Sequence, residues 1–303
     1  MIAILQASAF AIPLADSSVQ MVVTSPPYYG LRNYAANPDN AFGREATVGE
    51  YVQHAVEVLR EIHRVLRQDG VVFWNIADSY REKNLCLIPQ RIAIAAQDDG
   101  WIVRDQIIWH KPAPMPESAK DRCTRSYEPI LMLTKSAHYF WDTEAVAEKT
   151  NDLKTKPRRF RKGDASVTLR HDEGNHYQPR ATRNPRNVWT LSPTPFRGAH
   201  FATFPQGLPR RCILAASKPG DTVLDPFGGS GTTGVVAQEL GRNAVLLEIS
   251  PEYVKLMQKR MADVSGLPVK PVSKVVIFRA QEYEGSTPTG GGLTPPGMHM
   301  MVE

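Results

Sequence analysis

Residues 222–234 read TVLDPFGGSGTTG, and this stretch decides the fold class. A short strand-forming run leads into a turn with four glycines, and a helix-forming segment follows at once. Glycine permits positive φ and lets a ligand approach the backbone, and the helix N-terminus offers free N–H groups to an anionic group. The order of strand, glycine-rich turn and helix predicts a Rossmann-like α/β sheet with a ligand at this turn.

Two ligand classes compete for the turn. Gly229, Gly231 and Gly234 have the G-x-G-x-x-G spacing of a dinucleotide site, and Glu248 follows at a distance suited to a ribose hydroxyl. S-adenosylmethionine also carries an adenosine ribose, so Glu248 does not separate the two ligands. Asp225 favours S-adenosylmethionine, because an acid at the strand end attracts a methionine ammonium and repels a pyrophosphate. A purely structural glycine turn is the third interpretation.

The other apolar runs alternate between strand and helix patterns, which predicts a parallel sheet with helices on both faces. The predicted strands are Ile2–Gln6, Val19–Thr24, Val71–Ile76, Val103–Trp109, Ile130–Thr134, an edge piece His138–Trp141, Thr222–Leu224 and Ala244–Leu247. The predicted helices are residues 50–67, ended by Asp69-Gly70, then Ile88–Gln97, Leu208–Ser217, Thr232–Leu240 and Pro251–Met261. From about residue 146 to 200 the periodicity fails, which predicts an insertion outside the sheet.

A second turn, Ser25-Pro26-Pro27-Tyr28, follows the predicted strand Val19–Thr24. Two prolines stiffen the backbone and remove two N–H donors, which leaves carbonyl groups free to accept hydrogen bonds. The Ser25 hydroxyl and the Pro26 carbonyl can accept both hydrogens of an NH₂ group, and Tyr28 can stack on a planar ring. This turn suits a nucleobase that carries an exocyclic amino group; a proline turn that merely caps the strand is the alternative.

Charge and composition limit the classes of molecule that the chain is expected to bind. The chain carries a formal charge of +5, and residues 151–200 hold eleven Lys and Arg against four acids, an excess of +7. This block is a candidate surface for a polyanion, and a solvated loop is the alternative. The cysteines are far apart, and no leader or membrane-length apolar run is present. We therefore expect a cytoplasmic protein with no disulfide framework, no metal and no membrane partner.

Together the two turns resemble those of the amino-methylating DNA methyltransferases with permuted, β-type motif order, in which the catalytic motif precedes the cofactor motif. Trp109–Pro112, Tyr127–Glu128 and Arg186–Trp189 are similar to the family segments that flank its variable region. The resemblance spans residues 1–145 and 184–262. It implies an α/β, Rossmann-like S-adenosylmethionine-dependent methyltransferase fold, circularly permuted, with an inserted target-recognition region.

The resemblance also implies roles for individual residues. Ser25, Pro26, Pro27 and Tyr28 would be catalytic, and the S-adenosylmethionine site would comprise Ser8, Asp225, Phe227, Gly229, Gly231, Thr232 and Glu248. Ser8 departs from the family, which usually has an acid there to meet the adenine amino group of the cofactor, so we expect reduced cofactor affinity. Within the basic block, the predicted DNA contacts are Lys154, Arg158, Arg159, Arg161, Lys162 and Arg180.

The implied reaction is site-specific methyl transfer to a flipped base in double-stranded DNA. By the family's pattern, serine at the first catalytic position favours cytosine N4, with adenine N6 as the alternative; a nicotinamide oxidoreductase and a DNA-binding module without catalysis are more distant alternatives. We expect a catalytic half (1–145), a target-recognition insertion (146–200), a cofactor-binding half (201–265) and a C-terminal extension with a flexible tail (266–303). A cognate restriction endonuclease acting separately is an expected partner, and monomer and homodimer both remain open.

Overall fold

A computed structural model of the chain describes residues 1–30, 42–150, 158–159, 176–177, 181–192 and 204–265. It divides into two compact units, one formed by Met1–Trp141 with Asn187–Glu303 and the other by Asp142–Arg186. None of the helices in these described ranges is long and apolar enough to cross a membrane.

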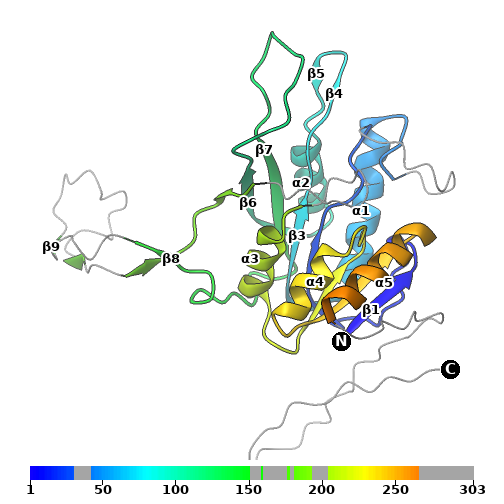
Figure 1. Cartoon of the computed structure of the whole chain (residues 1–303). Coiled ribbons are helices and arrows are strands. Elements are labelled where there is room, and N and C mark those ends of the chain that lie inside the picture. The colour runs from blue at the N-terminus through cyan, green and yellow to red at the C-terminus, as the bar shows by residue number, and fades with distance from the viewer. Residues whose placement is uncertain (31–41, 151–157, 160–175, 178–180, 193–203, 266–303) are drawn as a thin grey trace, which may run out of the picture. The chain divides into compact units, whose positions relative to one another are not determined.

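The first unit contains an eight-stranded sheet in the order β1-β14-β13-β2-β3-β7-β6-β12 (Figure 1). Its strands are β1 (Ile2–Gln6), β2 (Val19–Thr24), β3 (Leu66–Asn75), β6 (Ile102–His110), β7 (Tyr127–Thr134), β12 (Val188–Thr190), β13 (Thr222–Asp225) and β14 (Asn243–Glu248). All neighbouring pairs are parallel except that β7 runs antiparallel to both β3 and β6.

Helices cover both faces of this sheet. Successive apolar side chains of a buried strand point to opposite faces, so both faces need a covering layer. Val22 and Trp74 join a core cluster with α1 (Val48–Val65) and α2 (Ile88–Asp98). Met21 and Phe73 point to the other face and pack with α3 (Gly207–Ala216), α4 (Thr232–Glu239) and α5 (Pro251–Ser265). A Rossmann-like layering is thus present around the predicted glycine turn.

Six short strands of the described ranges lie outside this sheet and form three antiparallel pairs. In the first unit, β4 (Tyr80–Arg81) pairs with β5 (Asn84–Leu85). In the second unit, β8 (Glu148–Lys149) pairs with β11 (Thr182–Arg183), and β9 (Arg158–Arg159) pairs with β10 (His176–Tyr177). The low periodicity of this region agrees with strands of only two residues.

The structure corrects three predictions about the sheet. It is not wholly parallel, because β7 is reversed. Val188–Thr190 lies within the range predicted to be outside the sheet, yet it pairs with β6 as the strand β12. Residues 138–141 form no strand. Within the described ranges, one backbone hydrogen bond, from Phe140 N to Asp69 O, ties them to the bulged part of β3.

The first long helix ends earlier than Asp69-Gly70 predicts. α1 starts at a capping box between Thr47 and Glu50 and stops at Val65, and Leu66 is already extended and fully buried in the sheet. Between Leu66 and Val71 the strand bulges opposite β2. A Cβ on Gly70 would lie 2.8 Å from the Gln20 carbonyl oxygen, so Gly70 permits this bulge and does not end the helix.

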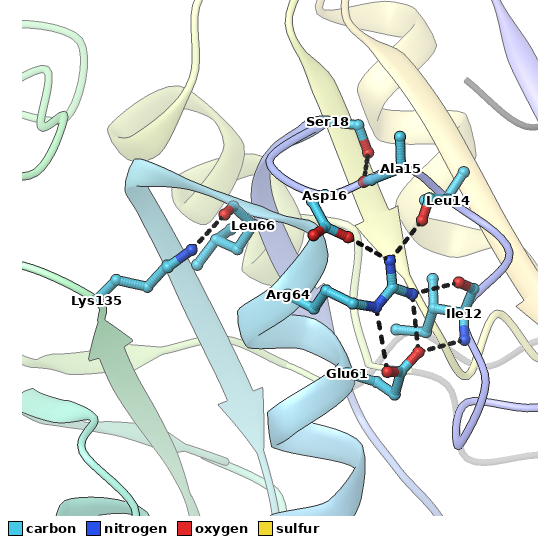
Figure 2. A network of polar contacts seen from close by, with 9 residues as sticks. All are labelled: Ile12, Leu14, Ala15, Asp16, Ser18, Glu61, Arg64, Leu66 and Lys135. Carbon is cyan, nitrogen blue, oxygen red and sulfur yellow. Dashed lines mark hydrogen bonds and ion pairs between the residues drawn. The ribbon is translucent and has the colours of Figure 1, made fainter. Parts of the chain in front are cut away.

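Arg64, in the last turn of α1, ties the β1–β2 connection to that helix (Figure 2). Its guanidinium donates to the carbonyl oxygens of Leu14 and Ile12 at 2.7 Å and pairs with Asp16 and Glu61 at 2.9 Å. Glu61 in turn accepts from the Ile12 backbone N–H. The connection that carries Ser8 is therefore anchored to the helix that packs under the sheet.

Candidate active site

Polar residues gather where the parallel strands end. Gln6, Glu248, Asp225, Thr24 and Asn75 are the last residues of β1, β14, β13, β2 and β3, which are neighbours in this order. Because β7 runs the opposite way, its first residues lie at the same end, beside the last residues of β6. Open α/β sheets place their ligands outside these carboxyl ends.

Ser25 and Tyr28, one turn beyond β2, form a directed hydrogen-bond chain. The Tyr28 hydroxyl donates to Glu128 Oε2 at 2.6 Å, and the Ser25 hydroxyl lies 3.1 Å from the Tyr28 oxygen. A carboxylate can only accept, so it takes the single hydrogen of Tyr28. The hydrogen between Ser25 and Tyr28 must then come from Ser25. Asn75 Nδ2 lies 3.3 Å from Ser25 Oγ, so one lone pair of this oxygen is left to accept from another group.

Asn75, Lys111 and Glu128 complete this cluster, and no pattern in the sequence singles them out as one site. Asn75 Nδ2 lies 2.7 Å from the Tyr28 oxygen, 2.9 Å from Glu128 Oε2 and 3.3 Å from Ser25 Oγ. Lys111 Nζ forms an ion pair with Glu128 Oε1. The resemblance of residues 109–112 and 127–128 to family segments indicates that they matter. It does not show that they lie beside Ser25 and Tyr28, because that contact depends on the reversed direction of β7.

The sequence predicts that the carbonyl groups of the proline turn stay free to accept hydrogen bonds, but one of them has a partner within the protein. The Pro27 carbonyl accepts from the Tyr51 hydroxyl of α1 at 2.8 Å, which anchors the turn. The Pro26 carbonyl has no hydrogen-bond partner among residues in the described ranges. The Pro26 carbonyl is therefore available as an acceptor, whereas the Pro27 carbonyl anchors the turn.

Asp225 is 2% exposed at the end of β13 and joins the two turns. Thr24 Oγ1 donates to its Oδ1 and Thr233 Oγ1 to its Oδ2, both at 2.6 Å, and the Phe227 N–H donates to Oδ1 at 3.1 Å. Burial nevertheless raises the pKa of Asp225 to about 6, although these hydrogen bonds lower it. A buried carboxyl with a disfavoured charge at a strand end is a functional candidate.

Asp225→Asn should make the ligand-free protein more stable at pH 8. The folded-state pKa of about 6 lies above the ordinary 3.8, so the wild-type chain loses stability as pH rises from about 4 to 7 and then levels off. The full loss corresponds to about 3 kcal/mol. Asparagine cannot ionise, and its amide can satisfy both threonines, so thermal unfolding should show a higher melting temperature than wild type at pH 8.

The same comparison at pH 4 should show almost no difference, because Asp225 is then protonated in the folded protein. Asp121→Asn is the matched control, since the Asp121 side chain is 65% exposed and pairs with Lys83 at the surface. A lower melting temperature for Asp225→Asn than for wild type at pH 8 would contradict the assignment of a disfavoured charge.

The glycines of the 228–234 turn divide into two groups. A Cβ on Gly231 (φ +78°) would lie 2.9 Å from Met261 Cε, and one on Gly234 would lie 2.7 Å from Leu246 Cδ1. These two glycines let α5 and β14 pack closely. A Cβ on Gly229 (φ +50°) would meet only the Phe227 oxygen, at 3.8 Å, so bare backbone faces open space there. On the side where a Cβ would be placed, Gly229 is thus open to a ligand and Gly231 is not.

Glu248 and Ser8 lie at neighbouring strand ends. Glu248 accepts from the Gly229 N–H at 3.0 Å and the Ser250 N–H at 2.9 Å, one bond on each carboxylate oxygen, which leaves an acceptor position on each oxygen. Burial raises the pKa of Glu248. Ser8 Oγ accepts from the Phe10 N–H at 3.2 Å and keeps a second acceptor position. This donor and acceptor set fits a ribose diol beside bare backbone.

Two other predicted cofactor residues are engaged by the protein. The Thr232 side chain is buried and accepts from Arg260 of α5 at 3.1 Å, so only its backbone at the start of α4 is available to a ligand. The partly buried Phe227 ring lies edge-on against Trp74, with ring centres 6.2 Å apart. The side chains of both residues contact the protein interior and support the glycine turn.

The predicted DNA contacts stay a prediction, because the structure does not describe their side chains. Lys154, Arg161, Lys162 and Arg180 lie outside the described residues. For Arg158 and Arg159 the structure gives backbone pairing with Tyr177 and His176, and no side chains.

Comparison with known proteins decides the family. The DNA methylase family model (N6_N4_Mtase) matches residues 19–259. The chain is 41% identical over 277 residues to the type II methyltransferase M.Cfr9I of Citrobacter freundii. The matched region covers 82% of this chain and 83% of the relative. The chain belongs to the DNA methylase family. It is also 30% identical over 264 residues to the DNA adenine methyltransferase YhdJ of Escherichia coli, with coverage of 85% and 81%.

Solved structures agree with this family. PvuII DNA methyltransferase, named as cytosine-N4-specific, superposes with a TM-score of 0.64 at 20% identity and covers 87% of this chain and 90% of that one. A putative DNA modification methylase of Thermus thermophilus, complexed with S-adenosylmethionine, gives 0.62 at 25% identity, with coverage of 88% and 96%. The predicted Rossmann-like methyltransferase fold is confirmed, and a nicotinamide oxidoreductase is excluded.

The DNA methylase is therefore an amino-methyltransferase of the restriction–modification kind, with S-adenosylmethionine as its methyl donor. When bound, the cofactor supplies an electrophilic methyl group on a sulfonium. The open backbone at Gly229 and the two acceptor positions of Glu248 are the features of this chain that fit it.

Proposed function

We propose that this DNA methylase transfers a methyl group to the N4 amino group of cytosine at a specific sequence in DNA. The observation that carries methyl transfer to an amino group is the direction of the hydrogen bond from Ser25 to Tyr28, and the presence of serine at this position supports the choice of cytosine. This direction makes Ser25 Oγ an acceptor toward the substrate, and an exocyclic amino group is a donor. A base presenting only a carbonyl oxygen would find no hydrogen there.

Acceptors suit the reaction because the lone pair of a nucleobase NH₂ is conjugated into the ring. When Ser25 Oγ and the Pro26 carbonyl accept its two hydrogens, the nitrogen moves toward a tetrahedral arrangement and its lone pair becomes available. The base must first leave the duplex, and the Tyr28 ring offers it a stacking surface. Catalysis here consists mainly of positioning and of stabilising charge in a site without bulk water.

Serine at the first position of Ser25-Pro26-Pro27-Tyr28 supports cytosine N4 by the family's pattern. The 30% identity to YhdJ, a protein named as a DNA adenine methyltransferase, keeps adenine N6 as the alternative. Both bases present an amino group to the same acceptors, so the hydrogen-bond geometry serves either.

For the cofactor, we assign Glu248 to the ribose hydroxyls, Gly229 and the backbone of Gly231 and Thr232 to the methionine end, and Ser8 to the adenine amino group. Asp225 would attract the methionine ammonium through its charge, and Phe227 would border the cofactor from the side of Trp74. Reduced affinity from Ser8 remains part of the proposal.

Target recognition is assigned to the insertion, whose excess of +7 in residues 151–200 supports contact with DNA phosphates. Cytoplasmic location and a separately acting cognate endonuclease are in keeping with a type II modification enzyme. A monomer and a homodimer both accommodate these assignments.

Expression in a host without DNA methylation tests the proposal directly. Genomic DNA from this host should acquire N4-methylcytosine at one sequence motif, read by sequencing that distinguishes both modified bases. N6-methyladenine at a single motif would replace the cytosine assignment by its alternative. Unmodified DNA, with folded protein and labelled S-adenosylmethionine present, would refute methyl transfer by this chain.

A further inference from the structure

The hydrogen-bond chain at the catalytic turn ends on a carboxylate that is built to receive a proton. Ser25 donates to Tyr28, and Tyr28 donates to Glu128, so all hydrogens in the chain point the same way. The Asn75 amide lies within hydrogen-bonding distance of all three oxygens and holds them in one cluster. Such an aligned chain can pass a proton by moving each hydrogen one step along.

Glu128 is paired with a cation and partly open to solvent. Lys111 pairs with its second oxygen and lies 4.4 Å from the centre of the Trp109 ring, which fixes the ammonium. The Glu128 side chain is 11% exposed, so water reaches the end of the chain. Burial, followed by the charge of Glu128, raises the pKa of Tyr28 far above its ordinary value. Tyr28 therefore stays protonated and can transmit a proton without becoming a phenolate reservoir.

We infer that Ser25, Tyr28 and Glu128 form a proton relay that removes the proton released by the target amino group. The inference rests on the proposed function, which supplies the amino group. The nitrogen lone pair forms the new N–CH₃ bond while the C–S bond breaks and its electrons return to sulfur, giving S-adenosylhomocysteine. The nitrogen then carries a positive charge and one hydrogen too many.

That hydrogen passes from nitrogen to Ser25 Oγ, the Ser25 hydrogen to Tyr28, and the Tyr28 hydrogen to Glu128. Glu128 ends as a neutral carboxylic acid and returns its proton to water. In the transition state the negative end of the chain already stabilises the positive charge that develops on nitrogen. Glu128 is hence the proton acceptor and Lys111 positions it, and both act on the base only through Tyr28 and Ser25.

Two conservative variants test the relay. Tyr28→Phe keeps the ring for stacking and removes the hydroxyl, and Glu128→Gln keeps the shape and an accepting oxygen but removes the base. Single-turnover methyl transfer to plasmid DNA from a methylation-free host should slow by about 10²–10³-fold in each. The KM values for DNA and S-adenosylmethionine should stay within about threefold of wild type, because Tyr28→Phe keeps the stacking ring and Glu128 is not assigned to contact either substrate.

The double variant separates a relay from two independent contacts. Because both changes interrupt one chain, it should be no more than about threefold slower than the slower single variant. Glu239→Gln is the matched control, since Glu239 also pairs with a cation, Arg210, but lies on α4 away from the catalytic turn. Its transfer rate should equal that of wild type.

Near-wild-type rates in both single variants, multiplicative losses in the double variant, or losses confined to KM would each overturn the relay. Melting temperatures identify a variant that fails to fold, in which case the other variant decides. Ser25→Ala tells the relay and the proposed function apart. If only Ser25→Ala is inactive, the proposed function stands and the relay falls; if Ser25→Ala is also active, the catalytic assignment itself fails.

Discussion

Ser25→Ala should abolish methyl transfer while the protein stays folded and still binds S-adenosylmethionine. The change removes one of the two oxygens proposed to accept from the target amino group, and with it the first member of the chain to Glu128. We expect the single-turnover rate to fall by about 10³-fold or more, within the range of lost acid–base and hydrogen-bonding groups. Labelled-methyl transfer measures the rate, and calorimetry measures cofactor affinity.

Binding should survive because Ser25 forms none of the contacts that shape the glycine turn; Thr24, its neighbour, holds Asp225. Ser18→Ala is the matched control. Ser18 precedes β2 and Ser25 follows it, and the Ser18 hydroxyl donates only to the Ala15 carbonyl, at 2.6 Å (Figure 2). A rate for Ser25→Ala within about tenfold of wild type would remove Ser25 from the mechanism, and a parallel loss of cofactor affinity would place it in the wrong pocket.

The sequence predicts those parts of the site that belong to one strand and the turn after it. Ser25, Asp225 and Glu248 each follow or end a buried apolar run, so local patterns locate them at the carboxyl end of a sheet. The fold class follows from the same patterns, since short β-branched runs alternate with amphipathic helices. Most strands of the sheet could therefore be placed without knowledge of their neighbours.

Contacts across the sheet could not be predicted in this way. A strand's direction leaves no mark on its apolar pattern, so nothing in Tyr127–Thr134 shows that β7 is reversed. That reversal pairs Asn75 with Ile130 and brings Glu128 next to Tyr28. Likewise, the glycine spacing predicts a ligand at Gly231, but the space beside it is filled by Met261, a residue of a helix thirty positions later in the chain.

Glu248→Ala should weaken the binding of S-adenosylmethionine and of adenosine to the same extent. Both ligands carry the ribose diol, and Glu248 is the carboxylate with an acceptor position left on each oxygen. Hydrogen bonds to a charged acceptor contribute about 1.5–3 kcal/mol each, so the loss of two should raise both dissociation constants by at least about 10²-fold. Calorimetry with each ligand gives the two ratios.

The variant also leaves the Gly229 and Ser250 N–H groups without their acceptor, so Glu248→Gln is needed beside it. Glutamine keeps one accepting oxygen and should give an intermediate loss, again equal for the two ligands. Glu252→Ala, an exposed acid in the first turn of α5, controls for the loss of a nearby charge and should change neither affinity. If S-adenosylmethionine weakened far more than adenosine, Glu248 would have to contact the methionine part, and the orientation of the cofactor along β14 and β13 would have to be reversed.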